Sequence, residues 1–383
     1  MKIIFNRQAA ASAAAPLMCA TGGKSVLSLS EGILIEAQSP DICIFTTYDL
    51  EKGIRTTVEA KVIEGGSYVI NAQKFIQTLR VMDGEEVTLT VDDKLSACMS
   101  SGRSSHRMSA LRGSDFPKLP ELTSELGFEI AHSVLRSMIG KVMYAMGVND
   151  QRQVLNGCYF LIRGNRMMLV ACDSYRLAKC TIETRLDNRN SDGSELRFAF
   201  IIPSKTINEL YKLIDDDDDK KIRIYMMRKH IIMEIDGITF FSRLIEGEYI
   251  DYDRIILTSH KIRAVVDRDE LMSALERAAL VTEERIAGSV RSHVKLEFND
   301  EVIKISANST AGSTYDEIEA ENVGGDICIA FNNRYLIDSL RSVSTEKVKL
   351  ALSSPLTSMN IEPVGEEETV EEIYMLLPVK MRE

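Results

Sequence analysis

The stretch IIPSKTINELYKLID, residues 201–215, decides how this chain of 383 residues is organised. Apolar and β-branched residues come first and indicate the end of a strand. Pro203 then suits the first position of a helix, where its missing N–H costs nothing. Apolar residues follow at helical spacing, at Ile207, Leu210, Tyr211 and Ile214. The stretch therefore predicts a strand that leads directly into an amphipathic helix.

The same pattern occurs twice more at nearly constant distance. VINAQKFIQTLRVMD spans residues 69–83 and IAFNNRYLIDSLRSV spans residues 329–343, with Asn71 and Asn332 as the expected helix caps. The three copies start 132 and 128 residues apart, at positions 69, 201 and 329. Self-similarity at a fixed period indicates a repeat architecture, so the chain is predicted to contain three related domains.

Each third of the chain also begins with a short strand and a helix. These helices are expected over residues 6–18, 131–143 and 267–280, and alternating or β-branched runs follow every helix in the chain. Each third then reads as two β-α-β-β-β halves in an α+β fold. Matching links at Ser109–Pro117 and Ser242–Ile250 place the domains at residues 1–125, 126–255 and 256–383.

Composition indicates a globular protein of the cytoplasm. Hydrophobic residues make up 45% and charged residues 27% of the chain. No apolar run approaches the ~20 residues of a membrane span, and the N-terminal segment is cut by Asn6-Arg7-Gln8 before a signal sequence could form. Seven cysteines without a C-x-x-C pair are typical of buried thiols in a reducing compartment.

The charges are distributed unevenly between helices and the rest of the chain. The net charge is −11, but the six expected helices carry eleven basic and six acidic residues. The helices therefore sum to +5 and the remainder to −16. Any one basic residue is more simply a solvated helix face, whereas the collective pattern favours helices that meet a polyanion.

Seven stretches spread over the whole chain carry a family resemblance. They are TTYDLEKGI (46–54), SGRSSHRMSAL (101–111), DFPKL (115–119), VLNGCYF (154–160), ACDSYRLA (171–178), IKISANS (303–309) and LLP (376–378). In order and spacing they resemble the beta subunits of bacterial DNA polymerase III, the sliding clamps. The resemblance implies a non-catalytic processivity factor for DNA replication. It also implies a head-to-tail homodimer that closes a ring around duplex DNA, with helices lining the hole and sheets outside.

The resemblance and the helix charges together name candidate DNA contacts. Spaced Lys and Arg side chains hold a phosphate backbone without reading its sequence, which a sliding protein requires. The candidates are Lys24, Lys74, Arg80, Arg136, Lys141, Gln151, Arg152, Gln153, Lys205, Lys212, Arg277 and Arg341.

A second implied site is an apolar pocket between the second and third domains. By resemblance it receives a short peptide from the catalytic subunit of the replicative polymerase, the clamp loader and other proteins with a clamp-binding motif. Its residues are Leu155, Cys172, Ser174, Tyr175, Arg176, Leu177, Ile250, Arg254, Ile255, Asn332, Tyr335, Leu356, Ser358, Met375, Leu377, Pro378 and Val379. Taken singly, Leu155 and Leu177 are more simply core residues.

The resemblance also implies the contact between two chains. It joins His106 and Met108, on an edge strand of the first domain, to Leu280 and Val281 of the third. An unpaired strand edge is a natural docking site for another sheet. Contact between two unlike surfaces can close a ring.

No constellation for catalysis or for a cofactor stands out. Gly23-Lys24-Ser25 resembles the end of a P-loop, but Met18 stands where the first glycine should be, so an ATPase is rejected. The acidic run Asp215–Asp219 is typical of a solvated hairpin loop, and no metal is expected there. Two alternatives stay open: a metal-dependent hydrolase that uses this acidic run, and a monomeric repeat scaffold without a DNA role.

Overall fold

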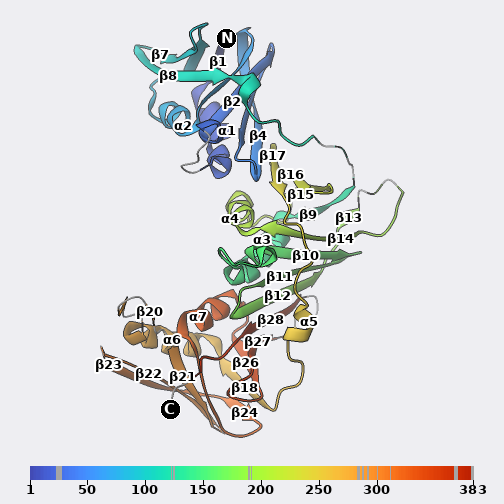
Figure 1. Cartoon of the computed structure of the whole chain (residues 1–383), viewed down its shortest axis with the longest axis vertical. Coiled ribbons are helices and arrows are strands. Elements are labelled where there is room, and N and C mark those ends of the chain that lie inside the picture. The colour runs from blue at the N-terminus through green and yellow to red at the C-terminus, as the bar shows by residue number, and fades with distance from the viewer. Residues whose placement is uncertain are drawn as a thin grey trace. The chain divides into compact units, whose positions relative to one another are not determined.

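The repeating unit of the chain is a strand, a helix and three further strands, and it occurs six times in the computed structural model. The structure describes residues 1–22, 28–121, 123, 126–188, 190, 192–282, 285–286, 289–290, 293–299, 301–310, 312–365 and 370–380. The expected α+β repeat of two β-α-β-β-β halves per third is confirmed (Figure 1).

The elements follow the same order in each third. The first third contains β1 (Lys2–Asn6), α1 (Arg7–Ala14), β2 (Gly32–Ser39), β3 (Ile42–Tyr48), β4 (Lys52–Glu64), β5 (Gly66–Asn71), α2 (Ala72–Val81), β6 (Glu86–Val91), β7 (Ser96–Ser101) and β8 (Ser104–Arg112). The second contains β9 (Gly127–Ala131), α3 (His132–Val142), β10 (Gly157–Arg163), β11 (Arg166–Cys172), β12 (Arg176–Glu183), β14 (Arg197–Pro203), α4 (Ser204–Leu213), β15 (Lys221–Met226), β16 (His230–Ile235) and β17 (Ile238–Arg243).

The third copy repeats this order. It contains β18 (Ile262–Asp267), α6 (Arg268–Thr282), β21 (His293–Phe298), β22 (Val302–Ser309), β23 (Gly312–Glu319), β25 (Ile327–Asn332), α7 (Asn333–Ser342), β26 (Lys347–Leu352), β27 (Met359–Val364) and β28 (Val370–Leu376). Three shorter elements lie between repeating units: β13 (Asp187–Asn188), α5 (Tyr252–Ile255) and β24 (Glu321–Val323). Two more, β19 (Arg285–Ile286) and β20 (Ser289–Val290), lie between α6 and β21.

The helices begin where their side chains can cap them. Asn71 Oδ1 accepts from the backbone N–H of Lys74 at 3.0 Å, and Asn332 Oδ1 accepts from that of Arg334 at 3.1 Å. These bonds satisfy N–H groups that have no partner inside the helix, so the expected caps are confirmed. Pro203 does not occupy the first helical position: it ends β14, and α4 begins at Ser204. Lacking an N–H, it sits at the strand end, where a donor is least needed.

The chain forms two compact units, and each unit contains one large antiparallel sheet. One unit comprises residues 1–134, 186–195 and 212–244, and the other comprises residues 135–185, 196–211 and 245–383. The sheet of the first runs β1-β6-β7-β8-β5-β2-β3-β4-β17-β16-β15-β9-β13. That of the second runs β14-β10-β11-β12-β28-β27-β26-β18-β24, and a separate four-stranded sheet runs β23-β22-β21-β25.

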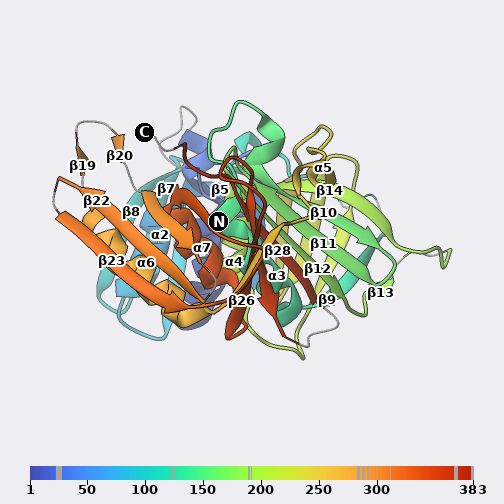
Figure 2. The same ribbon diagram turned by 90° about the horizontal axis from the view of Figure 1, so that it is seen from below.

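Two strand pairs join successive thirds of the chain into these sheets. β4 pairs with β17, for example Ile54 with Phe240, and β12 pairs with β28, for example Leu177 with Met375. Each sheet therefore continues from one third into the next. The helices pack on the sheets and on each other. α1 lies against α2 (Figure 1), and α6 lies against α7 and strands β22 and β23 (Figure 2).

The apolar faces predicted from periodicity form the core. On α2, Phe75, Ile76 and Leu79 are buried, and on α4 so are Ile207 and Leu210. In the first third, the fully buried Phe45 lies edge-on to Phe75, with ring centroids 5.5 Å apart. Phe45 thus carries much of the packing between the sheet and its helices.

We expect Phe45→Ala to lower the free energy of unfolding by about 3–5 kcal/mol, because truncation leaves a cavity that the close-packed core fills only in part. Urea denaturation followed by circular dichroism measures the change. Val81→Ala serves as the matched control on α2, since the Val81 side chain is 71% exposed and its loss should cost less than about 0.5 kcal/mol. Equal losses for the two variants would show that Phe45 is not central to the core.

Candidate functional site

Several residues of the predicted pocket meet in one apolar layer of the second unit. Leu155, Cys172, Leu177 and Met375 are buried members of a cluster that also contains Tyr249 and Ile256, and Ile250 packs against it. Burial raises the pKa of the Cys172 thiol to about 12, with a smaller contribution from the nearby Asp173 carboxylate. Cys172 is therefore an inert apolar residue. The sequence expectation that Leu155 and Leu177 are core residues agrees with this layer.

Other members of the predicted set are large apolar side chains that stay exposed: Tyr175, Ile255, Leu356, Leu377 and Val379. Backbone hydrogen bonds hold Leu377 and Val379 beside these side chains. The Leu377 N–H donates to the Tyr175 carbonyl at 2.9 Å. The Val379 N–H donates to the Ala330 carbonyl at 2.7 Å. The ring centroids of Tyr175 and Tyr335 lie 6.2 Å apart. Buried floor residues beside exposed apolar side chains are the usual composition of a site for an apolar segment.

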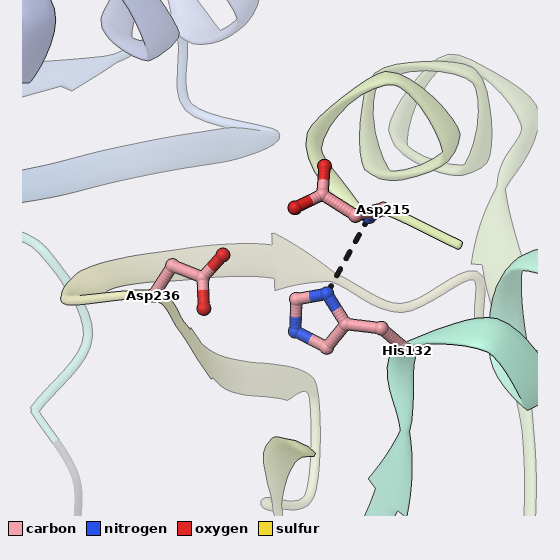
Figure 3. Close-up of side chains that lie close together, drawn as sticks. All are labelled: His132, Asp215 and Asp236. Carbon is pink, nitrogen blue, oxygen red and sulfur yellow. Dashed lines mark hydrogen bonds between the residues drawn. The ribbon is translucent and has the colours of Figure 1, made fainter. Parts of the chain in front are cut away.

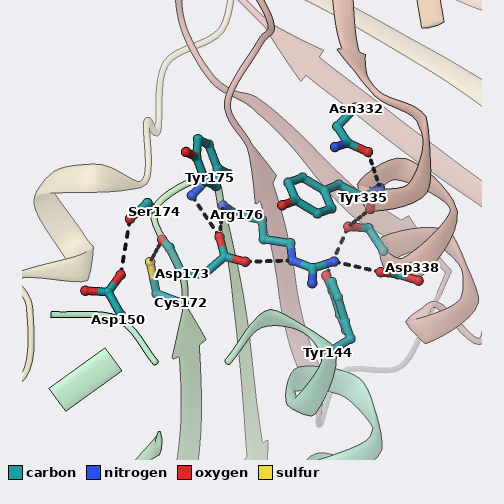
Figure 4. A network of polar contacts seen from close by, with 11 residues as sticks. Tyr144, Asp150, Cys172, Asp173, Ser174, Tyr175, Arg176, Asn332, Tyr335 and Asp338 are labelled. Carbon is teal, nitrogen blue, oxygen red and sulfur yellow. Dashed lines mark hydrogen bonds and ion pairs between the residues drawn. The ribbon is translucent and has the colours of Figure 1, made fainter. Parts of the chain in front are cut away.

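Arg176 is held in place by partners from both the second and the third copies of the repeat (Figure 4). Its Nε donates to Asp173 Oδ2 at 3.0 Å, and its Nη1 donates to Asp338 Oδ2 at 2.7 Å. The guanidinium also lies over the rings of Tyr335 and Tyr144, at 4.3 and 5.1 Å from their centroids. Burial lowers the pKa of Arg176, but the bonds to Asp338 and Asp173 outweigh it and raise that pKa overall. Arg176 is thus a permanently charged brace.

The polar members of the predicted pocket are also engaged. Asn332 caps α7, Ser358 is buried, and the exposed Arg254 pairs with Asp251 at 3.0 Å. Ser174 Oγ accepts from Arg152 Nη2 at 3.0 Å and donates to Asp150 Oδ2 at 3.3 Å. This contact links Ser174 to the loop that contains the candidate DNA contacts Gln151, Arg152 and Gln153, all of which are exposed.

Among the candidate DNA contacts, side chains on four helices are exposed: Lys74, Arg80, Lys205, Lys212, Arg277 and Arg341. Arg277 pairs with Asp316 at 2.7 Å and Arg341 with Glu276 at 3.1 Å. Exposed pairs of this kind are weak and exchange readily for phosphate. Arg136 is half-buried, lies 4.2 Å from the Tyr211 ring centroid and donates to the Tyr211 carbonyl. Lys24 lies outside the described residues.

Lys141 is the exception and corrects the sequence expectation. Its side chain is 14% exposed and forms an ion pair with Glu372, whose side chain is 3% exposed. Glu372 also accepts from the Tyr374 hydroxyl at 2.7 Å. The Lys141 ammonium is thus paired with the buried Glu372 carboxylate on β28, so Lys141 is not available to DNA. A partner 231 positions away leaves no signal in the local sequence.

The predicted chain-to-chain contact falls on strand edges. Residues Ser104–Ser109 of β8 pair with β7, and its last residues, Ala110–Arg112, pair with β5. In the described structure the other edge of Ser104–Ser109 is therefore open. His106 and Met108 line a hollow of about 490 Å³ there, which α2 completes with Lys74 and Arg80.

The residues expected on the other side of that contact lie on α6, beside a second strand edge. Leu280 is 84% exposed and Val281 half-buried. Strand β23, against which α6 packs, ends the four-stranded sheet and exposes Tyr315. Sequence reasoning missed β23 and the exposed Val81 of α2. The sequence does contain a signal for β23 as the partner edge. Its residues GSTYDEIE are acidic, whereas Ser104–Ser109, SSHRMS, contains the basic residues His106 and Arg107.

We expect Lys141→Met to lower the free energy of unfolding by about 3–5 kcal/mol, because it leaves the Glu372 carboxylate buried without its cation. Adding Glu372→Leu should restore most of that loss, since no charge is then buried and Tyr374 retains its bond to the Ser342 carbonyl.

The neighbouring pair Arg166–Glu371 gives the control for this measurement. Both side chains are more than half exposed, so Glu371→Gln should cost no more than about 1 kcal/mol in the same urea titration. A double variant as unstable as Lys141→Met would show that the lost stability comes from packing and not from the unpaired charge.

Comparison with known proteins gives matches along nearly the whole chain. Family models of the DNA polymerase III beta subunit match residues 1–120 (N-terminal domain), 129–251 (central domain) and 253–378 (C-terminal domain). A beta sliding clamp of Staphylococcus aureus is 27% identical over 369 residues, 93% of each chain.

Solved structures agree with these matches. The chain is similar to a DNA polymerase III subunit beta from Pseudomonas aeruginosa, with a TM-score of 0.89, 26% identity and 99% and 100% of the two chains covered. It is also similar to a putative DNA polymerase III beta subunit from Eubacterium rectale, with a TM-score of 0.91, 25% identity and full coverage of both chains. The chain therefore belongs to the DNA polymerase III beta subunit family, the sliding clamps, which are processivity factors without catalytic activity of their own.

Proposed function

We propose that two copies of this chain join head to tail into a ring that encircles duplex DNA and slides along it without sequence specificity. The observation that carries this proposal is the consecutive match of three clamp family models over residues 1–378 of a chain built from six like units. The proposed domains are residues 1–125, 126–255 and 256–383. The ring would work in the cytoplasm, where bacterial DNA is replicated. No helix in the described residues is long and apolar enough to cross a membrane.

Two open strand edges support the head-to-tail contact. Ser104–Ser109 of β8 and the outer side of β23 each present unpaired backbone groups in the described structure, which favour pairing with another strand. The β8 segment carries His106 and Arg107, and β23 carries Asp316 and Glu317, so their charges are complementary. Met108, Leu280 and Val281 would supply the apolar part of this interface.

Exposed basic side chains on the helices support the contact with DNA. Lys74, Arg80, Lys205, Lys212, Arg277 and Arg341 extend from α2, α4, α6 and α7, each with a flexible stem. Such side chains neutralise phosphate through screened contacts that move from one phosphate to the next as the ring slides. Lys141 is excluded from this set because Glu372 holds it.

The apolar layer and its exposed neighbours support a peptide-binding role. Leu155, Leu177 and Met375 form the floor, while Tyr175 and Leu377 stay exposed beside it. The partners proposed for this site are the catalytic subunit of the replicative polymerase, the clamp loader and other proteins that carry a clamp-binding motif. Arg176 acts there as a positioning residue, because its charge is already balanced by Asp173 and Asp338.

The ring proposal predicts topological retention on DNA. Once loaded on closed circular DNA, the protein should stay bound at salt concentrations that strip ordinary DNA-binding proteins, and it should run off after the circle is linearised. Gel filtration of labelled protein with DNA, before and after cutting, measures retention. Equal loss from both DNA forms would contradict a ring.

The two alternatives give different results in the same system. A monomeric scaffold would sediment as one chain and would not be retained on circular DNA. A hydrolase that uses the acidic run would depend on Asp216 and Asp218, whereas replacing both with Asn should leave retention of a ring unchanged.

The peptide site predicts that Tyr175→Ala and Leu377→Ala each weaken binding of a labelled clamp-binding-motif peptide of the cognate polymerase by about tenfold, the effect of about 1.4 kcal/mol of lost apolar contact. Fluorescence anisotropy measures the affinity. The control is Val148→Ala, since Val148 is an apolar residue that is even more exposed and belongs to no predicted site. A similar loss with Val148→Ala, or none with the other two, would place the peptide elsewhere.

A further inference from the structure

Three segments of the central repeat bring an imidazole and two carboxylates together, at a place that neither the DNA contacts nor the peptide site uses. His132 is the first residue of α3, Asp215 follows the end of α4, and Asp236 lies in the turn between β16 and β17 (Figure 3). All three residues belong to the first compact unit. One ligand atom from each lies within 4.8 Å of the other two.

His132 is buried but incompletely satisfied. Its side chain is fully buried, and its Nδ1 accepts only a long bond of 3.4 Å from the backbone N–H of Asp215. The other ring nitrogen, Nε2, has no hydrogen-bond partner and faces the side of the ring on which Asp236 lies (Figure 3). A buried polar atom without a partner is unfavourable, and Nε2 of His132 lies beside two carboxylates, so it is placed to bind a cation together with them.

The two carboxylates already hold a cation between them. Lys220 Nζ lies 2.5 Å from Asp215 Oδ2 and 2.9 Å from Asp236 Oδ2. The bond to Asp215, followed by that to Asp236, raises the pKa of Lys220. The Lys220 side chain is 38% exposed, so its ammonium is able to leave the two carboxylates and swing into solvent.

The donor set identifies the class of ion. One imidazole nitrogen and two carboxylate oxygens suit Zn²⁺ and similar transition ions, whereas Mg²⁺ and Ca²⁺ prefer oxygen ligands alone. Metal bonds near 2.1 Å separate tetrahedral ligands by about 3.4 Å. The ligand atoms, now within 4.8 Å of one another, therefore have to close by up to about 1.4 Å, which rotation of the exposed Asp215 and Asp236 side chains provides.

We propose that His132, Asp215 and Asp236 form a binding site for a divalent transition-metal ion of the Zn²⁺ class, which exchanges with the ammonium of Lys220. On binding, the ring hydrogen of His132 moves to Nδ1 so that Nε2 can coordinate, and the long contact from the Asp215 amide is given up. The ion would tie the start of α3, the end of α4 and the β16–β17 turn together. It is a structural clip, with no part in catalysis.

Titration of the full-length chain with Co²⁺ or Zn²⁺ tests the proposal. One ion should bind per chain, and Lys220→Met should tighten binding at least tenfold because it removes the competing cation. Asp236→Asn should weaken binding at least tenfold. Asp216→Asn is the matched control: Asp216 is an exposed acid of the same run outside the cluster, and its replacement should leave the affinity within twofold.

The Co²⁺ spectrum separates this site from the seven thiols of the chain, since thiolate ligands give intense charge-transfer bands that nitrogen and oxygen ligands lack. His132→Gln should abolish the visible bands while the thermal unfolding midpoint of the metal-free protein reports whether the variant folds. The proposal fails if Lys220→Met binds no more tightly than the unchanged chain. It also fails if Asp236→Asn binds as well, or if Asp216→Asn loses as much affinity as Asp236→Asn. Retention on circular DNA tests the ring separately, because the metal site does not depend on it.

Discussion

The open edge of a β-sheet is the constraint on which the rest of this structure depends. A β-α-β-β-β half covers one sheet face with its helix but leaves strand edges whose N–H and C=O groups need partners. The chain resolves this between its thirds by pairing β4 with β17 and β12 with β28. Among the edges that stay open in the described residues, Ser104–Ser109 and β23 carry opposite charge. The same physical requirement that joins the thirds supports the proposed contact with a second copy at these two edges.

The buried charges of the second unit are concentrated along the joint between β12 and β28. Arg176 stands on β12 and is paired with Asp173 and Asp338, while Glu372 stands on β28 and is paired with Lys141. Buried ion pairs add little net stability, because desolvation offsets most of the attraction. They do penalise a wrong register, since a slip of one residue would leave these charges without partners in the interior. We interpret them as the elements that fix how the second and third repeats align.

The local pattern of apolar residues and helix caps is enough to predict the repeat and its helices from the sequence. The α7 helix was expected over residues 332–343 and spans Asn333–Ser342, because its apolar stripe and its cap are both encoded within one segment. What the sequence could not provide is pairing across long distances. Lys141 was assigned to DNA because helical spacing places it among other basic residues, and its partner Glu372 is far along the chain. His132 likewise has no signal in the local sequence: the acidic run is typical of a solvated hairpin loop, and only the fold brings a buried imidazole beside it.

The position of the proposed peptide site follows from the pairing of strands between the second and third repeats. Leu177 and Met375, two residues of its floor, are directly paired across β12 and β28, and Arg176 is paired with Leu376 one step along. Neither repeat alone has both halves of this floor. Formation of the apolar site therefore requires that the two strands be paired in the correct register, which the flanking ion pairs enforce. The ion pairs of Arg176 and the proposed recognition of an apolar peptide are therefore linked: the paired charges fix the strand register, and that register gives the apolar floor the fixed shape that the proposed peptide would need.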